Sequence, residues 1–142
     1  MEYIYDSKEF KDSSLYKTFS NINTGTGILK IEAYTASGAY PLKNVDIVVS
    51  KEFGEDKVIF FNGTTNDSGI IDNIILPTRS TTKEITQASD IIYTTYDLIA
   101  KYPQYNVQKK YDVSIFDDIK VIQPITFPLD DLIEGEEDER KS

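Results

Sequence analysis

The sequence predicts an all-β protein built as a seven-stranded antiparallel sandwich, and two observations support this fold class. Apolar and polar residues alternate through most of residues 27–127, for example at Val45, Ile47 and Val49, so that one face of each strand meets a core. Short clusters of turn residues interrupt the alternating runs, as is typical of sandwiches. A chain of 142 residues is also large enough for one domain with a single core.

The expected strands follow one another at short intervals. They cover residues 28–35, 44–50, 57–63, 70–76, 93–100, 107–116 and 120–127. The stretch at 78–90 is rich in Thr and Ser and is long enough to connect the two sheets. Pro124 cannot donate a hydrogen bond to a neighbouring strand, so the last strand is expected at the edge of its sheet.

The predicted sandwich spans residues 26–129, and both ends of the chain lie outside it. Residues 1–25 are polar and are expected to form an irregular N-terminal arm. The alternative for the arm is a short amphipathic turn with Asp12 as its N-cap, because three apolar residues follow at helical spacing. These are Leu15, Phe19 and Ile22. Residues 130–142 are acidic and poor in apolar side chains, so we expect a disordered acidic tail.

The alternation also predicts which side chains point into the core. They are Leu29, Ile31, Val45, Ile47, Val49, Ile75, Tyr96, Leu98, Val113 and Ile125. A shift of one residue in any strand would bury a charge such as Lys30, Glu32 or Asp46 without a partner, so the register is strongly specified. Asp46 and Asp72 are then expected on the solvent face.

The composition excludes several classes of function. The chain has no histidine and no cysteine, which removes Ser-His and Cys-His nucleophiles and ordinary zinc sites, and no metal or cofactor is predicted. The formal charge of -9 repels phosphate backbones and anionic bilayers, so neither nucleic acid nor a membrane is an expected partner. No apolar stretch could span a bilayer, and residues 1–25 contain no signal-peptide core.

The residues that could carry chemistry each have a simpler structural explanation. The chain has 24 acidic residues, but surface carboxylates are far commoner than catalytic ones. The oxygen-rich segment Asn66-Asp67-Ser68-Gly69 also has the composition of an ordinary turn, which explains it better than a calcium site. Lys30 could cross-link to Asn106, although a surface lysine explains it better. We therefore predict that the chain is not an enzyme.

Two groups of residues are candidates for binding a partner. The first is an apolar, strand-forming run that would accept an extended peptide if it lay at a sheet edge, and would be core if it were central. It consists of Lys57, Val58, Ile59, Phe60 and Phe61. The second group is Tyr102 and Tyr105, which are expected at outward or loop positions. These two tyrosines, with Tyr34 and Tyr93, could also stack on sugar rings, whereas sheet packing explains most tyrosines.

Several motifs resemble those of the prealbumin-like, or carboxypeptidase-regulatory-like, β-sandwich modules. The motifs are Tyr40-Pro41-Leu42 after the first strand, Thr65-Asn66-Asp67-Ser68-Gly69, Leu76-Pro77, Tyr93-Thr94-Thr95-Tyr96 and Gln123-Pro124-Ile125. The resemblance extends over residues 27–129 and is closest to modules of clostridial spore-cortex-lytic and peptidoglycan-binding proteins. It implies a Greek-key connection of the strands. The hydroxyisourate hydrolases of this fold depend on histidines and a Tyr-Arg-Gly-Ser end, and this chain has neither.

Taken together, the residues and the resemblance predict a non-catalytic accessory or interaction module. The resemblance implies a protein or peptidoglycan-associated partner in a spore or cell-wall context. One alternative is a structural component of a phage-like particle or spore layer. Another is an accessory hydrolase that uses carboxylates alone, which would require a positioned acid with a shifted pKa.

Overall fold

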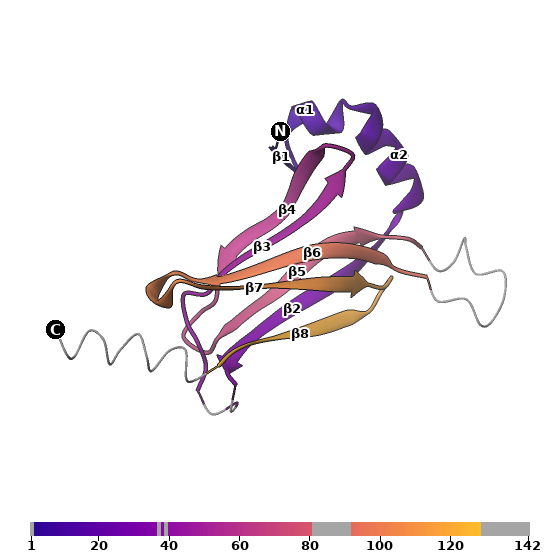
Figure 1. The fold of residues 1–142 in the computed structure, drawn as a ribbon. Helices are drawn as coiled ribbons and strands as arrows, with labels where there is room; N and C mark the ends of the chain where they lie inside the picture. The colour runs from indigo at the N-terminus through magenta and orange to yellow at the C-terminus, as the bar shows by residue number, and fades with distance from the viewer. Residues whose placement is uncertain (1, 37, 39, 81–91, 129–142) are drawn as a thin grey trace.

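The computed structural model describes residues 2–36, 38, 40–80 and 92–128 and confirms an all-β sandwich (Figure 1). Eight strands make up two sheets in this part of the chain. The strands are β1 (Glu2–Ile4), β2 (Gly25–Thr35), β3 (Asp46–Phe53), β4 (Asp56–Thr64), β5 (Ile70–Thr78), β6 (Thr94–Tyr102), β7 (Val107–Ile115) and β8 (Lys120–Phe127). The helices are α1 (Lys8–Lys11), α2 (Ser14–Ile22) and the single 3-10 turn η1 (Pro103–Tyr105). The predicted acidic tail and most of the predicted connection at 78–90 lie outside the described residues.

The strand order corrects the predicted seven-stranded antiparallel arrangement. One sheet has the order β1-β4-β3-β6-β7 and the other has the order β5-β2-β8. Each of the seven expected strands is present, and β1 is the additional one. The pairs β1–β4 and β2–β8 are parallel, which is possible because neither pair is a hairpin, whereas β2–β5 and β3–β6 are antiparallel although they too are distant in the sequence. β8 lies at the edge of its sheet, as Pro124 predicts, and the Greek-key connection stays a prediction.

The core lies between the two sheets and contains nearly all of the side chains that the alternation places there. Of these, Ile75 is the exception: it is 65% exposed, whereas its neighbours Ile74 and Leu76 are buried. The pairing of β2 with β5 shifts between Leu29 and Ile31, and Asn73 has a positive φ of 58°. This irregularity reverses the inward and outward positions in the second half of β5, which a simple alternation cannot show.

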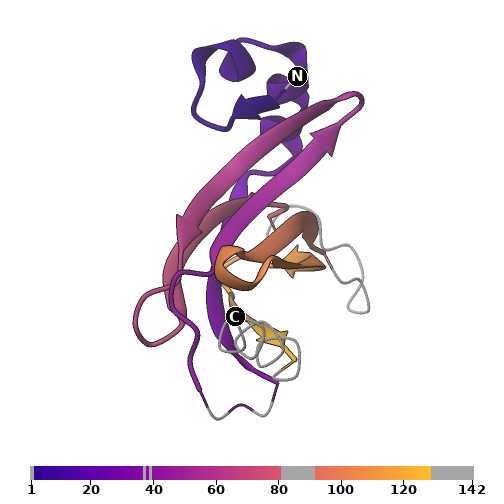
Figure 2. The same cartoon turned by 60° about the vertical axis from the view of Figure 1, so that its left-hand side comes forward.

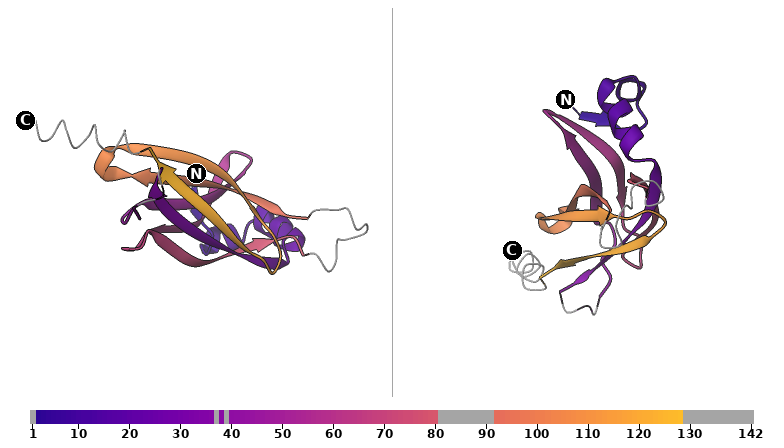
Figure 3. Two further views of the ribbon diagram at one scale, coloured as in Figure 1. Left: turned by 90° about the horizontal axis from the view of Figure 1, so that it is seen from below. Right: turned by 90° about the vertical axis from the view of Figure 1, so that its right-hand side faces the viewer.

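The N-terminal segment is ordered, which corrects the predicted irregular arm. β1 adds to the five-stranded sheet, and α1 and α2 lie at the end of the β3–β4 hairpin (Figures 2 and 3). α2 begins after Ser13, whose Oγ accepts a hydrogen bond from the Tyr16 N–H at 3.1 Å, so Asp12 is not the N-cap. Phe10 and Phe19 are buried, whereas Leu15 and Ile22 are exposed.

An aromatic cluster attaches this segment to the sandwich. The Phe19 ring lies 5.3 Å from that of Phe53 in β3 and 5.6 Å from that of Phe60 in β4. Phe10 contacts Phe53 at 5.5 Å, and the Tyr5 ring stacks on Phe60 at 4.6 Å. Aromatic pairs at these separations stabilise the fold by more than the burial of their apolar surface alone. The helices therefore close one end of the core.

Thr65 joins the end of β4 to the segment that leads into β3, and its hydroxyl gives a testable prediction. Thr65 Oγ1 donates to the Leu42 carbonyl at 2.6 Å and accepts from the Val45 N–H at 3.0 Å, all at buried positions. Thr65→Val keeps the shape but leaves both backbone groups unpaired, so we expect it to lower the free energy of unfolding by about 1–3 kcal/mol. Urea melts measure this loss.

The neighbouring Thr64 provides the control for Thr65. Thr64 is exposed in β4, so Thr64→Val should change the free energy of unfolding by no more than about 0.5 kcal/mol. Equal urea midpoints for the two variants would show that the two hydrogen bonds of Thr65 do not hold this segment.

Candidate functional site

The outer edge of β4 is covered by β1 over only part of its length. β1 pairs with β4 in parallel from Glu2 opposite Lys57 to Ile4 opposite Ile59, and the Tyr5 N–H donates to the Ile59 carbonyl at 2.7 Å. The chain then turns away, since the Ser7 N–H donates back to the Ile4 carbonyl at 2.8 Å. No other described strand pairs with this side of β4. The edge beyond Ile59 is therefore open.

A groove lies where β1 ends, and we call it the β4 edge groove. It has a volume of about 380 Å³. It is lined by Ile4, Ile59, Phe60, Phe61 and Asn62. Ile4 is 66% exposed, so an apolar side chain stands at one end of the groove with little protein around it. Such an edge, with unpaired backbone groups beside apolar side chains, is suited to pairing with another extended segment.

An irregularity in β4 shapes this groove. The pairing of β3 with β4 shifts between Val49 and Ser50, so that Phe60 is an extra residue in β4. The Phe60 ring contacts the buried Tyr96 at 5.0 Å. Phe61 pairs opposite the buried Val49, so the two adjacent phenylalanines both lie on the core side of the sheet. One wall of the groove is therefore formed by two phenylalanines that pack against the core.

The structure separates the residues that the sequence nominates for partner binding. Val58 is fully buried, and Lys57 forms an ion pair with Glu2 at 4.0 Å, so these two residues belong to the core and to the β1 contact. Tyr102 lies at the far end of β6, where its ring contacts Tyr105 at 5.2 Å and packs against the core. The nominated residues do not form one surface. The apolar run is partly edge and partly core, which combines the two alternatives drawn from the sequence.

A second, polar depression lies on the outer face of the five-stranded sheet, and we call it the outer hollow. Its volume is about 310 Å³. It is lined by Ser50, Glu52, Lys57, Asp97, Leu98, Ile99, Lys110, Tyr111 and Asp112. Ser50 in β3 pairs opposite Asp97 in β6, which pairs opposite Asp112 in β7. Two carboxylates thus face each other across neighbouring strands beside a buried hydroxyl.

Sequence reasoning missed the outer hollow because it depends on which strands are neighbours. Asp97 and Asp112 each occupy an outward position of an expected strand, and this signal was available. Their facing positions follow only from the register of β6 with β7. Ser50 and Asp97 come together only through the pairing of β3 with β6, whose strands are 40 or more residues apart.

On the inner side of the same sheet, Lys51 is the charged residue next to Ser50. The Lys51 ammonium group donates to the Thr95 carbonyl at 2.7 Å and lies 5.7 Å from the centre of the Tyr96 ring. Burial lowers the pKa of Lys51, and the negative charge of Asp97 partly opposes this effect. Burial also raises the pKa of Tyr96, whose hydroxyl donates to the Pro77 carbonyl.

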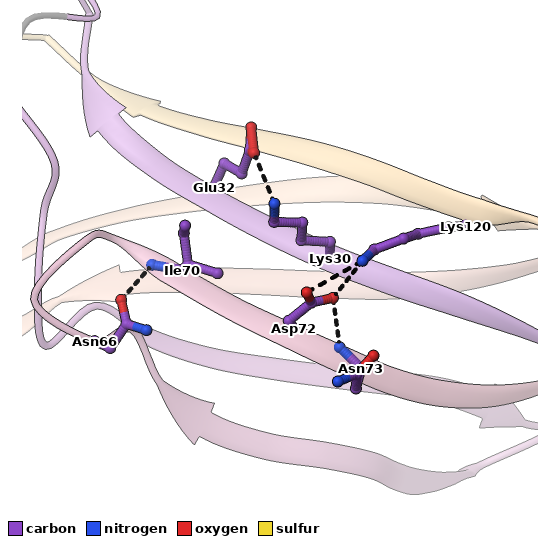
Figure 4. A network of polar contacts seen from close by, with 7 residues as sticks. All are labelled: Lys30, Glu32, Asn66, Ile70, Asp72, Asn73 and Lys120. Carbon is purple, nitrogen blue, oxygen red and sulfur yellow. Dashed lines mark hydrogen bonds and ion pairs between the residues drawn. The ribbon is translucent and has the colours of Figure 1, made fainter.

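The remaining candidates from the sequence serve structural roles on the outer face of the three-stranded sheet (Figure 4). Lys30 lies 3.5 Å from Glu32, and it is on a different sheet from the loop that holds Asn106, so no cross-link is set up between them. Asp72 pairs with Lys120 at 2.9 Å. The Lys120 hydrogen bond, followed by the Asn73 N–H, holds the pKa of the Asp72 carboxyl below its usual value.

The segment from Asn66 to Gly69 is a turn, as its composition predicts. Asn66 Oδ1 accepts from the Ser68 N–H at 2.9 Å. It also accepts from the Ile70 N–H at 3.0 Å, the bond drawn in Figure 4. Within the described residues, no group of three or more acidic side chains is placed to hold a metal ion. None of the described helices is long and apolar enough to cross a bilayer.

No protein-family model and no curated protein matches the sequence. Solved structures do match. The 5-hydroxyisourate hydrolase of Klebsiella pneumoniae is 19% identical with a TM-score of 0.48, over 72% of this chain and 90% of that one. An (S)-allantoin synthase is 14% identical with a TM-score of 0.51, over 80% of this chain and 45% of that one. A mutant of the shaft pilin SpaA from Lactobacillus rhamnosus GG is 18% identical with a TM-score of 0.49, over 72% of this chain and 50% of that one.

The likeness to the synthase corrects the prediction that the chain is not an enzyme. The synthase is an enzyme by its name, and at a TM-score of 0.51 it shares this fold over 80% of the chain. The all-β architecture therefore does not exclude catalysis, and that prediction was wrong. At 14% identity this likeness shows the fold and assigns no activity. It is consistent with the all-β sandwich that the alternation predicts.

Proposed function

We propose that this chain is a binding module that receives an extended segment of a protein partner along the edge of β4 beyond Ile59. The observation that carries the proposal is the short reach of β1, which pairs with β4 only as far as Ile59 and leaves the β4 edge groove beside the open edge. A partner strand would continue the five-stranded sheet through backbone hydrogen bonds. Its side chains would enter the groove at every second position.

The apolar lining supports a peptide more than a polar ligand at this position. Ile4 and Ile59 stand on the same face of the sheet, because they are opposite each other in the register. Covering the exposed side chain of Ile4 would remove apolar surface from water, which contributes about 1.5–3 kcal/mol for a large aliphatic side chain. Hydrogen bonds supply the rest of the affinity, and the groove supplies selectivity.

The biological context stays a prediction. The spore or cell-wall setting rests on the motif resemblance alone, and no contact among the described residues favours the phage-like or spore-layer alternative. A carboxylate hydrolase needs an acid with a raised pKa. Asp72 does not meet this requirement, because its hydrogen bond with Lys120 lowers its pKa.

A peptide selection tests this proposal. Random linear peptides displayed on phage are selected on the full chain, and the Kd of the best peptides is measured by fluorescence anisotropy. We expect Ile4→Asp to weaken their binding by about tenfold, because one large apolar contact is lost and a charge enters the groove. Hydrogen exchange of the backbone amides at 60–64 should slow when the peptide binds.

Ile75 provides a matched control. It is 65% exposed, against 66% for Ile4, but it lies on the other sheet, so Ile75→Asp should leave the peptide Kd unchanged. Peptides that bind the two variants equally well, or that slow no amide exchange in β4, would rule out the β4 edge as the binding site.

A further inference from the structure

The outer hollow combines two features that a protein without a ligand has little reason to keep. The first is the pair of Asp97 and Asp112, which are directly opposite each other on antiparallel strands. Side chains in this position have Cβ atoms about 4.5–5.5 Å apart, and like charges there destabilise the sheet. Both aspartates are exposed, and no described cation forms an ion pair with Asp112.

The second feature is the hydroxyl group of Ser50. Ser50 is 1% exposed, and its Oγ has no hydrogen-bond partner among the described residues. An unpaired buried hydroxyl costs free energy, because it loses its hydrogen bonds to water without replacement. Ser50 shares the outer face with Asp97, its partner in the register, and lines the hollow. Its hydroxyl lies beneath the floor of the hollow with almost no accessible surface, so a ligand group that pairs with it must displace a neighbouring side chain.

We propose that the outer hollow binds a small amino alcohol, a ligand that carries a primary ammonium group and at least one hydroxyl. The ammonium group lies between the carboxylates of Asp97 and Asp112 and removes their repulsion. A ligand hydroxyl pairs with Ser50 Oγ, which can both donate and accept. This site is separate from the β4 edge groove, and the proposal does not depend on the proposed function.

The other charged residues of the hollow agree with a cationic ligand. Lys57 is opposite Glu52 in the register and forms an ion pair with Glu2, so its charge is already balanced. Lys110 lies opposite the apolar Ile99, two residues along each strand from the two aspartates. Lys51 interacts with Asp97 from the inner side of the sheet, so Asp112 is the carboxylate of the pair that a ligand ammonium would neutralise most. Hydrogen bonds between charged groups are also stronger than those between neutral ones.

Three compounds of matched shape test the proposal by NMR titration of the full chain at pH 6.5. The tris(hydroxymethyl)methylammonium ion carries the ammonium and hydroxyl groups, pentaerythritol carries hydroxyls without charge, and tert-butylammonium carries the charge without hydroxyls. We expect the first to bind most tightly, with backbone amide shifts around Ser50, Asp97 and Asp112. Pentaerythritol should bind at least about tenfold more weakly, because it lacks the charged group.

Variants assign the two contacts separately. Asp112→Asn should weaken binding of both ammonium compounds about tenfold and should raise the Tm of the free protein, because the facing like charges are gone. Ser50→Ala should abolish the preference for tris(hydroxymethyl)methylammonium over tert-butylammonium. Asp46→Asn, on the same face but outside the hollow, should change neither. Equal binding of pentaerythritol and the ammonium compounds, or unchanged binding by Asp112→Asn, would overturn the proposal.

Discussion

Replacing Gly69 with alanine is expected to lower the free energy of unfolding by about 2–5 kcal/mol, from a left-handed backbone cost of about 1–2 kcal/mol and overpacking of about 1–3 kcal/mol. Gly69 has a φ of +76°, and a Cβ atom there would lie 2.4 Å from the Ala33 carbonyl oxygen. Neither backbone can move freely, because the Ala33 N–H donates to the Gly69 carbonyl at 2.7 Å. Urea melts monitored by circular dichroism measure the change.

Gly54 separates the two contributions. Its φ is +64°, and no atom lies within 4 Å of the position of an added Cβ. Gly54→Ala should therefore cost only the left-handed backbone term, about 1–2 kcal/mol. If the two alanine variants unfold at the same urea concentration, the contact between the Gly69 turn and β2 is not tight, and the turn does not fix the start of β5.

The strands of the sandwich could be predicted because each depends on the residues within and next to it. Alternation over five to nine residues decides which face of a strand is apolar, and turn residues decide where a strand ends. The last strand, 120–127, was expected and observed with the same bounds, and Pro124 correctly placed it at an edge. Buried Ile47 and Val49 likewise follow from their own positions in β3.

The rest could not be predicted, because it depends on contacts between distant segments. The register shift opposite Leu29 reversed the inward positions around Ile75, and nothing within β5 alone shows it. Residues 1–25 are polar on average, but Phe10 and Phe19 find aromatic partners in β3 and β4. Tertiary packing, rather than local propensity, makes these short helices stable.

For the candidate site too, part could be predicted from the sequence and part depends on contacts between distant strands. The apolar run from Lys57 to Phe61 is visible in the sequence, but whether it is an edge depends on strand order. The structure gives a mixed answer, because three residues of β1 cover the first part of the run and leave the second part open. The facing aspartates of the outer hollow required the register between β6 and β7. The sequence can therefore indicate which residues lie at the surface, but not which of them lie next to one another.

Ile47→Ala is expected to lower the free energy of unfolding by about 2–5 kcal/mol, because it leaves a cavity where the surrounding core relaxes only partly. Ile47 is fully buried and pairs opposite the buried Ala100 in β6 and opposite Gly63 in β4. Both neighbours are small, so neither side chain can fill the space that the lost methyl and methylene groups leave. Urea melts measure the effect. An unchanged m-value would show that the variant exposes the same amount of surface on unfolding as the original chain.

The adjacent residue Asp46 tests the register from which this prediction comes. Asp46 is half-buried on the outer face and pairs opposite the exposed Lys101, so the two form a cross-strand pair of opposite charge. Asp46→Ala should therefore change the free energy of unfolding by no more than about 0.5 kcal/mol. One position separates the two residues, so a shift of β3 by one residue would exchange their roles. Melts in which Asp46→Ala is as harmful as Ile47→Ala would contradict this register and, with it, the packing of β3 against the opposite sheet.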